Sequence, residues 1–185
     1  MMPHPSPLTP HAPIGVMGGT FDPVHVGHLR LAEEMAEAIG LERVLFIPAG
    51  QPPHRGVPRT ASLHRLEMAR RAIAGNPRFV VDAREVQRPR PSYTVDTLTA
   101  LRAELGKEQP LWLLLGADAF LELPTWHDWR QLFELELFAA RIAAAQQDRE
   151  SYALSIQAAV SATGMRSTRN IPLREPASAS CTTPW

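Results

Sequence analysis

The chain has 185 residues, of which 44% are hydrophobic and 21% charged, and its 19 basic residues balance its 19 acidic residues. This length suits one α/β domain, and a formal net charge of zero excludes the global basic field of nucleic-acid-binding proteins. The single cysteine excludes a disulfide framework within the chain, and no apolar run approaches the roughly 18 residues of a membrane span. We therefore expect a cytoplasmic protein with small-molecule partners and without nucleic-acid or membrane partners. The sequence carries no signal for the oligomeric state.

The chain is divided by composition into a leader, a domain and a tail. Residues 1–13 are rich in proline and lack the pattern of a signal peptide, which predicts a disordered leader. Residues 14–170 carry the periodic apolar pattern of a folded domain. Residues 171–185 form a low-complexity segment without an apolar helical face, which predicts a disordered tail.

The stretch from Ile14 to Leu29 is the most informative part of the sequence. Ile14–Met17 predicts a buried strand, and Gly18 and Gly19 have no Cβ atoms, so their backbone N–H groups can face phosphate oxygens. After a turn, an amphipathic helix is predicted from about Val24 to Gly40. The positive N-terminal end of this helix points back at the glycines, so the sequence predicts an anion site.

Two histidines open this helix at positions 25 and 28. Residues three apart share one helix face, so both imidazoles can reach the same anion. Two alternatives stay open for a short His-x-x-His motif: one capping and one core histidine, or a metal site. The metal site is weakened because Asp22 is the only further ligand nearby and the single cysteine lies far away in the sequence.

Further strands and helices follow in alternation. The apolar runs predict strands at 43–47, 79–81 and 111–115 and helices at 62–74, 92–105 and from about 125. Ser92 or Thr94 and Thr125 are the expected N-caps, and Leu135–Ala145 favours helix by propensity. The alternation predicts a single doubly wound α/β domain with a mostly parallel sheet and a ligand cleft at the carboxyl ends of the first and fourth strands.

The run Gly18–His28 resembles the signature of the adenylyl- and cytidylyltransferase superfamily, which places it at the end of the first strand of a Rossmann-like sheet. Three further segments, Pro52–Arg55, Ser92–Thr94 and Leu123–Trp126, look like those of bacterial nicotinate mononucleotide adenylyltransferases. The glycine spacing lacks the Gly-x-Gly-x-x-Gly of dinucleotide-binding dehydrogenases, which argues against an oxidoreductase. The resemblance implies transfer of the adenylyl group of ATP to nicotinate mononucleotide, giving deamido-NAD and pyrophosphate.

The resemblance also implies a set of site residues. The catalytic residues would be His25 and His28. ATP would be bound by Gly18, Gly19, Thr20, Phe21, His28, Gly116, Asp118, Ser161, Thr163 and Arg166. The mononucleotide would be bound by Gly19, Thr20, His54, Arg55, Ser92, Tyr93, Thr94, Trp126 and His127. Mg²⁺ would accompany ATP, held by substrate and water without protein side chains.

The resemblance is nearly unbroken from Ile14 to about Phe138 and weakens beyond it. The family has a fifth strand soon after the helix that begins at about residue 125. In this sequence, propensity favours helix at that place. Val160–Arg166 keeps a Ser-Ala-Thr-x-x-Arg pattern that is typical of a triphosphate-binding helix start. Two alternative functions remain: another nucleotidyltransferase of the superfamily, or a nucleotide-binding protein whose turnover is impaired by its altered C-terminal end.

Overall fold

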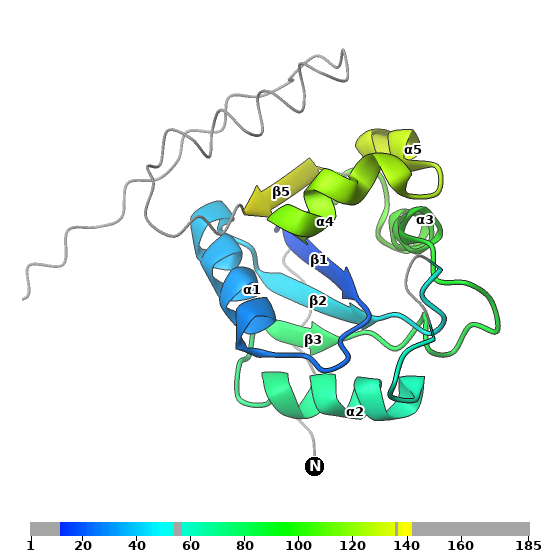
Figure 1. Cartoon of the computed structure of the whole chain (residues 1–185). Helices are drawn as coiled ribbons and strands as arrows, with labels where there is room; N and C mark the ends of the chain where they lie inside the picture. Colours follow the sequence, from blue (N-terminus) through cyan, green and yellow to red (C-terminus); the bar gives the residue numbers. More distant parts are fainter. Residues whose placement is uncertain (1–11, 54–56, 136, 142–185) are drawn as a thin grey trace, which may run out of the picture.

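The computed structural model describes residues 12–53, 57–135 and 137–141 (Figure 1). The expected leader up to residue 11 and the expected tail at 171–185 lie outside these ranges. The strands are β1 (Ile14–Gly19), β2 (Arg43–Pro48), β3 (Phe79–Val81), β4 (Leu111–Gly116) and β5 (Leu137–Arg141). The helices are α1 (Val26–Ile39), α2 (Ser62–Ile73), α3 (Thr94–Leu105), α4 (Ala117–Glu122), the 3₁₀ turn η1 (Leu123–Thr125) and α5 (Trp129–Leu135).

The described strands form one sheet in the order β3-β2-β1-β4-β5, and every neighbouring pair is parallel. The chain leaves β1 toward β2 and β3 on one side and returns next to β1 with β4. This reversal of direction makes β1 and β4 the point where ligands bind in open parallel sheets, just outside the carboxyl ends of the strands. The predicted doubly wound architecture is therefore that of the structure, and the expected ligand cleft at the ends of β1 and β4 corresponds to this point of reversal.

Alternate strand residues bury two hydrophobic cores on opposite faces of the sheet. On one face, Val16 and Leu113 pack against α3 and α5, with Leu98 and Leu132 fully buried. On the other face, the core joins the sheet to α1 and α2 and consists of Met17, Phe21, Ala32, Met35, Ala36, Leu41, Val44, Phe46, Ile73, Phe79 and Leu114. Helices thus cover both faces, as the near-continuous apolar strands require.

Helix ends follow the predicted glycines. Gly40 is the C-cap of α1 with φ 74°, and Gly106 is the C-cap of α3 with φ 84°. Both lie in the region of positive φ that glycine adopts without the steric cost of a Cβ atom. These two predicted helix stops are confirmed.

The expected helix starts were less accurate. The prediction that α1 begins at about Val24 was two residues early, since the N-cap is His25. Neither Ser92 nor Thr94 is the N-cap of α3, because that position belongs to Tyr93. Thr125 does not cap the next α-helix: it ends η1 and its hydroxyl donates to the Glu122 carbonyl at 2.7 Å. A hydroxyl residue near a helix start is thus only an approximate marker of the boundary.

The helix expected over Leu135–Ala145 was wrong within the described part of that segment. Leu137–Arg141 is β5, which pairs in parallel with β4 from Trp112 to Gly116. Helix propensity amounts to less than about 1 kcal/mol per residue, so strand pairing with the open edge of β4 overrides it.

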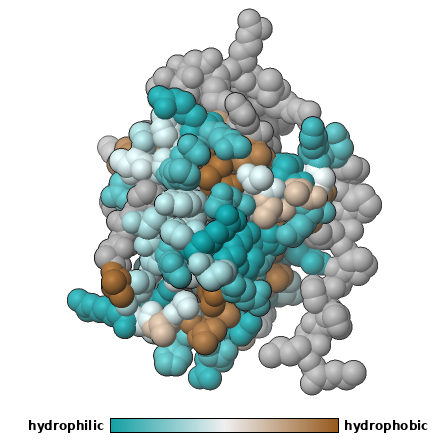
Figure 2. All heavy atoms as spheres, turned by 90° about the vertical axis from the view of Figure 1, so that its right-hand side faces the viewer, coloured by the Kyte–Doolittle hydropathy of each residue, from teal (hydrophilic) through white to brown (hydrophobic). Residues whose placement is uncertain are grey.

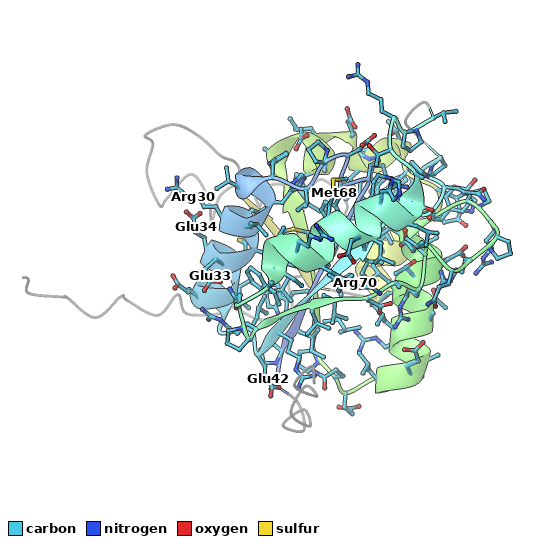
Figure 3. All side chains as sticks on the ribbon, turned by 90° about the horizontal axis from the view of Figure 1, so that it is seen from below. Arg30, Glu33, Glu34, Glu42, Met68 and Arg70 are labelled. Carbon is cyan, nitrogen blue, oxygen red and sulfur yellow. The ribbon has the colours of Figure 1, made fainter. Side chains whose placement is uncertain are left out.

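The face shown in Figure 2 is mostly hydrophilic where its residues are described. Figure 2 shows the face on the α3 side, where hydrophobic side chains form several separate patches among hydrophilic ones. Figure 3 shows the molecule from below. Arg30 and Glu34 of α1 lie at the outer surface there and form an ion pair with a distance of 2.8 Å between Nε and Oε1. Among the described residues, no helix combines the length and apolar character that crossing a membrane requires.

Candidate functional site

Gly18 and Gly19 are the last two residues of β1, two residues beyond the predicted strand end at Met17, and we call the segment Gly18–Phe21 the glycine turn. Gly18 is exposed, and a Cβ atom built on it would meet nothing within 4 Å, so the backbone there is open to a ligand. Gly19 differs, because a Cβ atom would lie 2.8 Å from the ring of Phe21. Phe21 itself is buried at 2% exposure with φ 50°, and the Asp22-Pro23 peptide bond is cis. The turn is therefore held by a buried aromatic ring under the backbone.

The imidazoles of His25 and His28 lie side by side at the N-terminus of α1, with ring centroids 3.8 Å apart. The backbone N–H of His25 donates to Nδ1 of His28 at 3.2 Å, which is one half of a capping box. A neutral His28 with Nδ1 as acceptor carries its proton on Nε2. The capping alternative is thus part of the answer for His28, and the two rings remain adjacent at the helix end.

Two neighbours explain the orientation of these rings. A Cβ atom at Gly27 would lie 3.1 Å from the His25 ring, so glycine at this position lets the imidazole fold over the helix start. The ring of Phe21 meets that of His28 edge-on, with centroids 5.0 Å apart. The glycine between the histidines therefore has a steric role, and the buried phenylalanine supports the second imidazole.

The loop after β2 is joined to the segment before α3. Ser92 Oγ accepts hydrogen bonds from the backbone N–H groups of Gly50 at 2.9 Å and Gln51 at 3.3 Å. The Ser92 N–H in turn donates to the Gln51 carbonyl at 2.9 Å. The Ser92 hydroxyl thus fixes one loop against the other, a role that its expected contact with the mononucleotide had not indicated.

Glu85 lies next to Ser92 and Thr97, where the loop after β2 meets the segment before α3. Its side chain is 6% exposed and accepts a 2.6 Å hydrogen bond from the Thr97 hydroxyl. Burial raises the pKa of Glu85 above its ordinary value, although the Thr97 and Ser92 hydroxyls act in the opposite direction. A Cβ atom at Gly50 would collide with the Glu85 carbonyl oxygen, so only glycine fits at that point of the loop.

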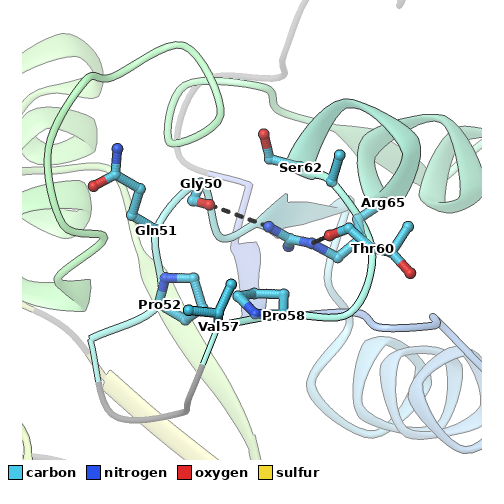
Figure 4. Close-up of a pocket in the computed structure, with 9 residues that line it drawn as sticks. Gly50, Gln51, Pro52, Val57, Pro58, Thr60, Ser62 and Arg65 are labelled. Carbon is cyan, nitrogen blue, oxygen red and sulfur yellow. Dashed lines mark hydrogen bonds between the residues drawn. The ribbon is translucent and has the colours of Figure 1, made fainter.

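Sequence reasoning missed Arg65, which lies between the segments that follow β1 and β2. Arg65 is 1% exposed and lines a hollow of about 360 Å³ together with Gly50, Gln51, Pro52, Val57, Pro58, Thr60, Ala61 and Ser62 (Figure 4). The signal that could have found it is spacing: Arg65, Ala69 and Ile73 are four apart and all buried on one face of α2. Leu63, which apolar spacing alone would place on the buried face of this helix, is instead 69% exposed.

The fourth strand brings Gly116 and Asp118 to the same edge. Gly116 ends β4 and is the N-cap of α4, and a Cβ atom there would lie 2.7 Å from Asp118 Oδ1. The Asp118 side chain thus folds back over the strand end and stays exposed. This position next to β1 is compatible with contact to a nucleotide, whereas no side-chain hydrogen bond caps α4.

An aromatic cluster lies at the start of α3. The rings of Tyr93 and His127 stack with centroids 4.3 Å apart and a tilt of 35°. Trp126 is partly buried and packs against the core that includes Val95 and Leu123. Trp129 also packs against that core. The structure therefore places Tyr93 and His127 together and gives Trp126 a packing role beside any ligand role.

Five of the expected site residues, His54, Arg55, Ser161, Thr163 and Arg166, lie outside the described residues. Asp22, the expected third ligand in the metal alternative, directs Oδ2 to the backbone N–H groups of Arg59 at 2.8 Å and Thr60 at 3.3 Å. Over the ranges that the structure describes, no group of three or more His, Cys, Asp or Glu side chains is placed to hold a metal ion.

A parallel sheet whose first strand ends in an open glycine turn, followed by a helix N-terminus carrying paired imidazoles, defines a nucleotide-binding α/β class. The chain belongs to the cytidylyltransferase-like family, whose model matches residues 16–169.

Similar proteins agree with this assignment. A probable nicotinate-nucleotide adenylyltransferase of Dechloromonas aromatica is 61% identical over 123 residues, which are 66% of this chain and 57% of that protein. Its counterpart in Halorhodospira halophila is 59% identical over 121 residues, 65% of this chain and 55% of that protein. The chain thus spans little more than half the length of the curated relatives that it matches.

Solved structures share the fold. A Plasmodium falciparum nicotinic acid mononucleotide adenylyltransferase complexed with NaAD has a TM-score of 0.63 and 18% identity, over 79% of this chain and 71% of that one. A putative nicotinate-nucleotide adenylyltransferase of Vibrio parahaemolyticus has a TM-score of 0.58 and 17% identity, over 70% of this chain and 72% of that one.

Proposed function

We propose that the protein transfers the adenylyl group of ATP to nicotinate mononucleotide, giving deamido-NAD and pyrophosphate. The observation that carries the proposal is the pair of imidazoles of His25 and His28, 3.8 Å apart at the N-terminus of α1 and next to the open backbone of Gly18. The names of the curated relatives support the choice of nicotinate mononucleotide as the acceptor.

The reaction needs no nucleophile from the protein. A phosphate oxygen of the mononucleotide attacks the α-phosphorus of ATP, a new P–O bond forms, and the bond to the β-phosphate breaks. Pyrophosphate leaves with the electron pair of that bond. Position and charge stabilisation therefore supply the rate, and the helix N-terminus, backbone N–H groups and imidazole N–H groups provide both.

The proposed roles follow the position of each residue at the sheet edge. The turn Gly18–Phe21 and His28 bind the ATP phosphates, with Gly116 and Asp118 on the neighbouring strand for the rest of the nucleotide. Tyr93, Thr94, Trp126 and His127 surround the pyridine ring and its carboxylate. Stacking of Tyr93 on His127 supports the second assignment, because a flat aromatic surface already exists there.

Mg²⁺ enters this scheme with ATP. Magnesium prefers oxygen ligands and keeps several waters, so substrate phosphates and water supply its coordination. When bound, the ion neutralises charge on the phosphates. The protein's own residues orient the phosphates through the glycine turn, and the buried Phe21 ring packs against that turn.

The test is pyrophosphate release from ATP with nicotinate mononucleotide, nicotinamide mononucleotide or phosphopantetheine as acceptor. We expect turnover with the first and a weaker response to the second. Preference for phosphopantetheine would assign the chain to another reaction of the superfamily. ATP binding without turnover on any acceptor would make it a nucleotide-binding protein and contradict the proposal.

A further inference from the structure

Arg65 is the largest fully buried side chain of the described residues, and its guanidinium forms no salt bridge with a carboxylate among them. Burying a charge is costly unless hydrogen bonds replace the lost water. The Arg65 guanidinium donates to three backbone carbonyls instead. Figure 4 shows the bonds from Nε to Thr60 at 3.0 Å and from Nη2 to Gly50 at 3.1 Å, and the third runs from Nη1 to Thr20 at 2.5 Å.

These three carbonyls belong to three different segments. Thr20 follows the glycine turn of β1, Gly50 lies in the loop after β2, and Thr60 precedes α2. One rigid, planar group therefore holds the turn proposed for ATP against the loop whose Gly50 N–H is bonded to Ser92. Lysine has no planar fork and could not reach all three carbonyls in this geometry.

Asp22 joins two of the same segments, the residues after β1 and the loop before α2. Its Oδ2 accepts from the Arg59 and Thr60 N–H groups, while Arg65 reaches back to Thr20. The Thr60 hydrogen bonds, opposed in part by desolvation, lower the pKa of Asp22 below its ordinary value, and the charge of Arg65 acts in the same direction as those bonds. The carboxylate therefore stays ionised and keeps the loop before α2 in place beneath Arg65.

We propose that Arg65 is a positioning residue of the adenylyl transfer, which sets the distance between the turn that binds ATP and the loop that leads to the mononucleotide. The inference rests on the proposed function. A reaction between two bound substrates depends steeply on their relative placement. Loss of Arg65 should therefore slow turnover far more than it weakens the binding of either substrate alone.

The experiment compares Arg65→Met, Arg65→Lys and the control Arg70→Met in the full chain. Arg70 lies on the same helix (Figure 3), but its side chain is 55% exposed and its nearest carboxylate oxygen, on Glu67, is 3.9 Å away. Turnover is measured per folded molecule, and calorimetry gives the affinity for ATP and for nicotinate mononucleotide separately.

We expect Arg65→Met to lower kcat about 10- to 100-fold, to change each separate affinity less than about threefold, and to be only partly restored by lysine. Arg70→Met should match the wild type. A kcat per folded molecule equal to that of the wild type would overturn the inference, as would a loss of affinity as large as the loss of turnover.

A second measurement separates this inference from the proposed function. If the wild type shows no turnover on any acceptor, the proposed function fails, and hydrogen exchange then decides the inference. In the wild type, ATP should protect the amides of residues 18–20 and also those of Gly50 and Gln51. In Arg65→Met, ATP should protect the amides of residues 18–20 but not those of Gly50 and Gln51. Equal protection in both proteins would contradict the role of Arg65.

Discussion

The ring of His28 lies against that of His25 with centroids 3.8 Å apart, while its Nδ1 accepts the His25 backbone N–H. One side chain thus stabilises the first turn of α1 and also lies at the proposed anion site. Because capping a helix is worth about 1 kcal/mol, the loss of His28 should affect stability modestly and the chemistry strongly.

We expect His28→Ala to lower kcat on the order of 10²-fold, with a smaller change in substrate affinity, because its hydrogen bond should strengthen as charge develops on the transferred phosphate. Steady-state kinetics with ATP and nicotinate mononucleotide provide the measurement. His64→Ala is the matched control, since His64 is exposed on α2. Near-normal turnover of the His28 variant would leave it a capping residue only.

The two glycines of the β1 turn should respond differently to substitution. A Cβ atom at Gly18 meets no protein atom within 4 Å, so Gly18→Ala should keep its melting temperature and lose ATP affinity about tenfold or more. At Gly19 the same atom presses on the buried Phe21 ring, so Gly19→Val should also lose about 1–3 kcal/mol of stability. Calorimetry and thermal melting test both, and unchanged ATP affinity in Gly18→Ala would disprove the anion site.

The buried carboxyl of Glu85 should make stability depend on pH. Because burial raises its pKa above the ordinary 4.5, the folded state binds this proton more tightly than the unfolded state. Its contribution to stability is therefore greatest at low pH and decreases as pH rises from 4.5 through the raised pKa.

Glu85→Gln keeps an oxygen for the Thr97 hydroxyl and removes the buried charge. We expect the variant to be more stable than the wild type at neutral pH, with an advantage that shrinks toward pH 4.5. Urea unfolding across this pH range is the measurement. An advantage independent of pH would mean that Glu85 does not titrate there.

Binding of nicotinate mononucleotide should depend on Trp126. We expect Trp126→Ala to weaken nicotinate mononucleotide about tenfold or more and to leave ATP nearly unchanged. Trp129→Ala is the control, because both indoles pack against the same core and both changes should lower stability. Equal weakening of both substrates by Trp126→Ala would place this indole in the core alone.

The proposed mononucleotide site around Tyr93, Trp126 and His127 should distinguish nicotinate from nicotinamide mononucleotide. An amide NH₂ facing backbone donors leaves them unpaired, which costs about 1–3 kcal/mol, or roughly ten- to a hundredfold in kcat/KM. Competition between the two mononucleotides measures this ratio directly. Equal efficiency with both would remove the carboxylate pocket.

Much of the fold could be predicted because its strands are continuous apolar runs. Ile14–Gly19 and Leu111–Gly116 are buried on both faces, a pattern that few other elements of this length share. β5 could not be predicted from its residues, because Leu137–Arg141 has alanine in place of β-branched side chains and becomes a strand only by pairing with β4.

The site was predictable where chemistry and local sequence coincide. His25 and His28 follow the glycine turn directly, so the sequence already placed them at one helix end. Arg65 acts through long-range bonds to Thr20 and Gly50, 45 and 15 residues away, and an arginine on a helix ordinarily indicates a solvated surface. Roles of this kind depend on tertiary contacts that local patterns do not contain.

The central position of β1 has a consequence for synthesis on the ribosome. β2 can pair with β1 as soon as residue 48 has emerged, but the second edge of β1 waits for β4, which begins at Leu111. Until then a nascent chain presents an apolar, unpaired strand edge, which is the kind of surface that other chains bind during aggregation. Chaperones that bind nascent chains, and the speed of translation between β2 and β4, should therefore influence the yield of folded protein.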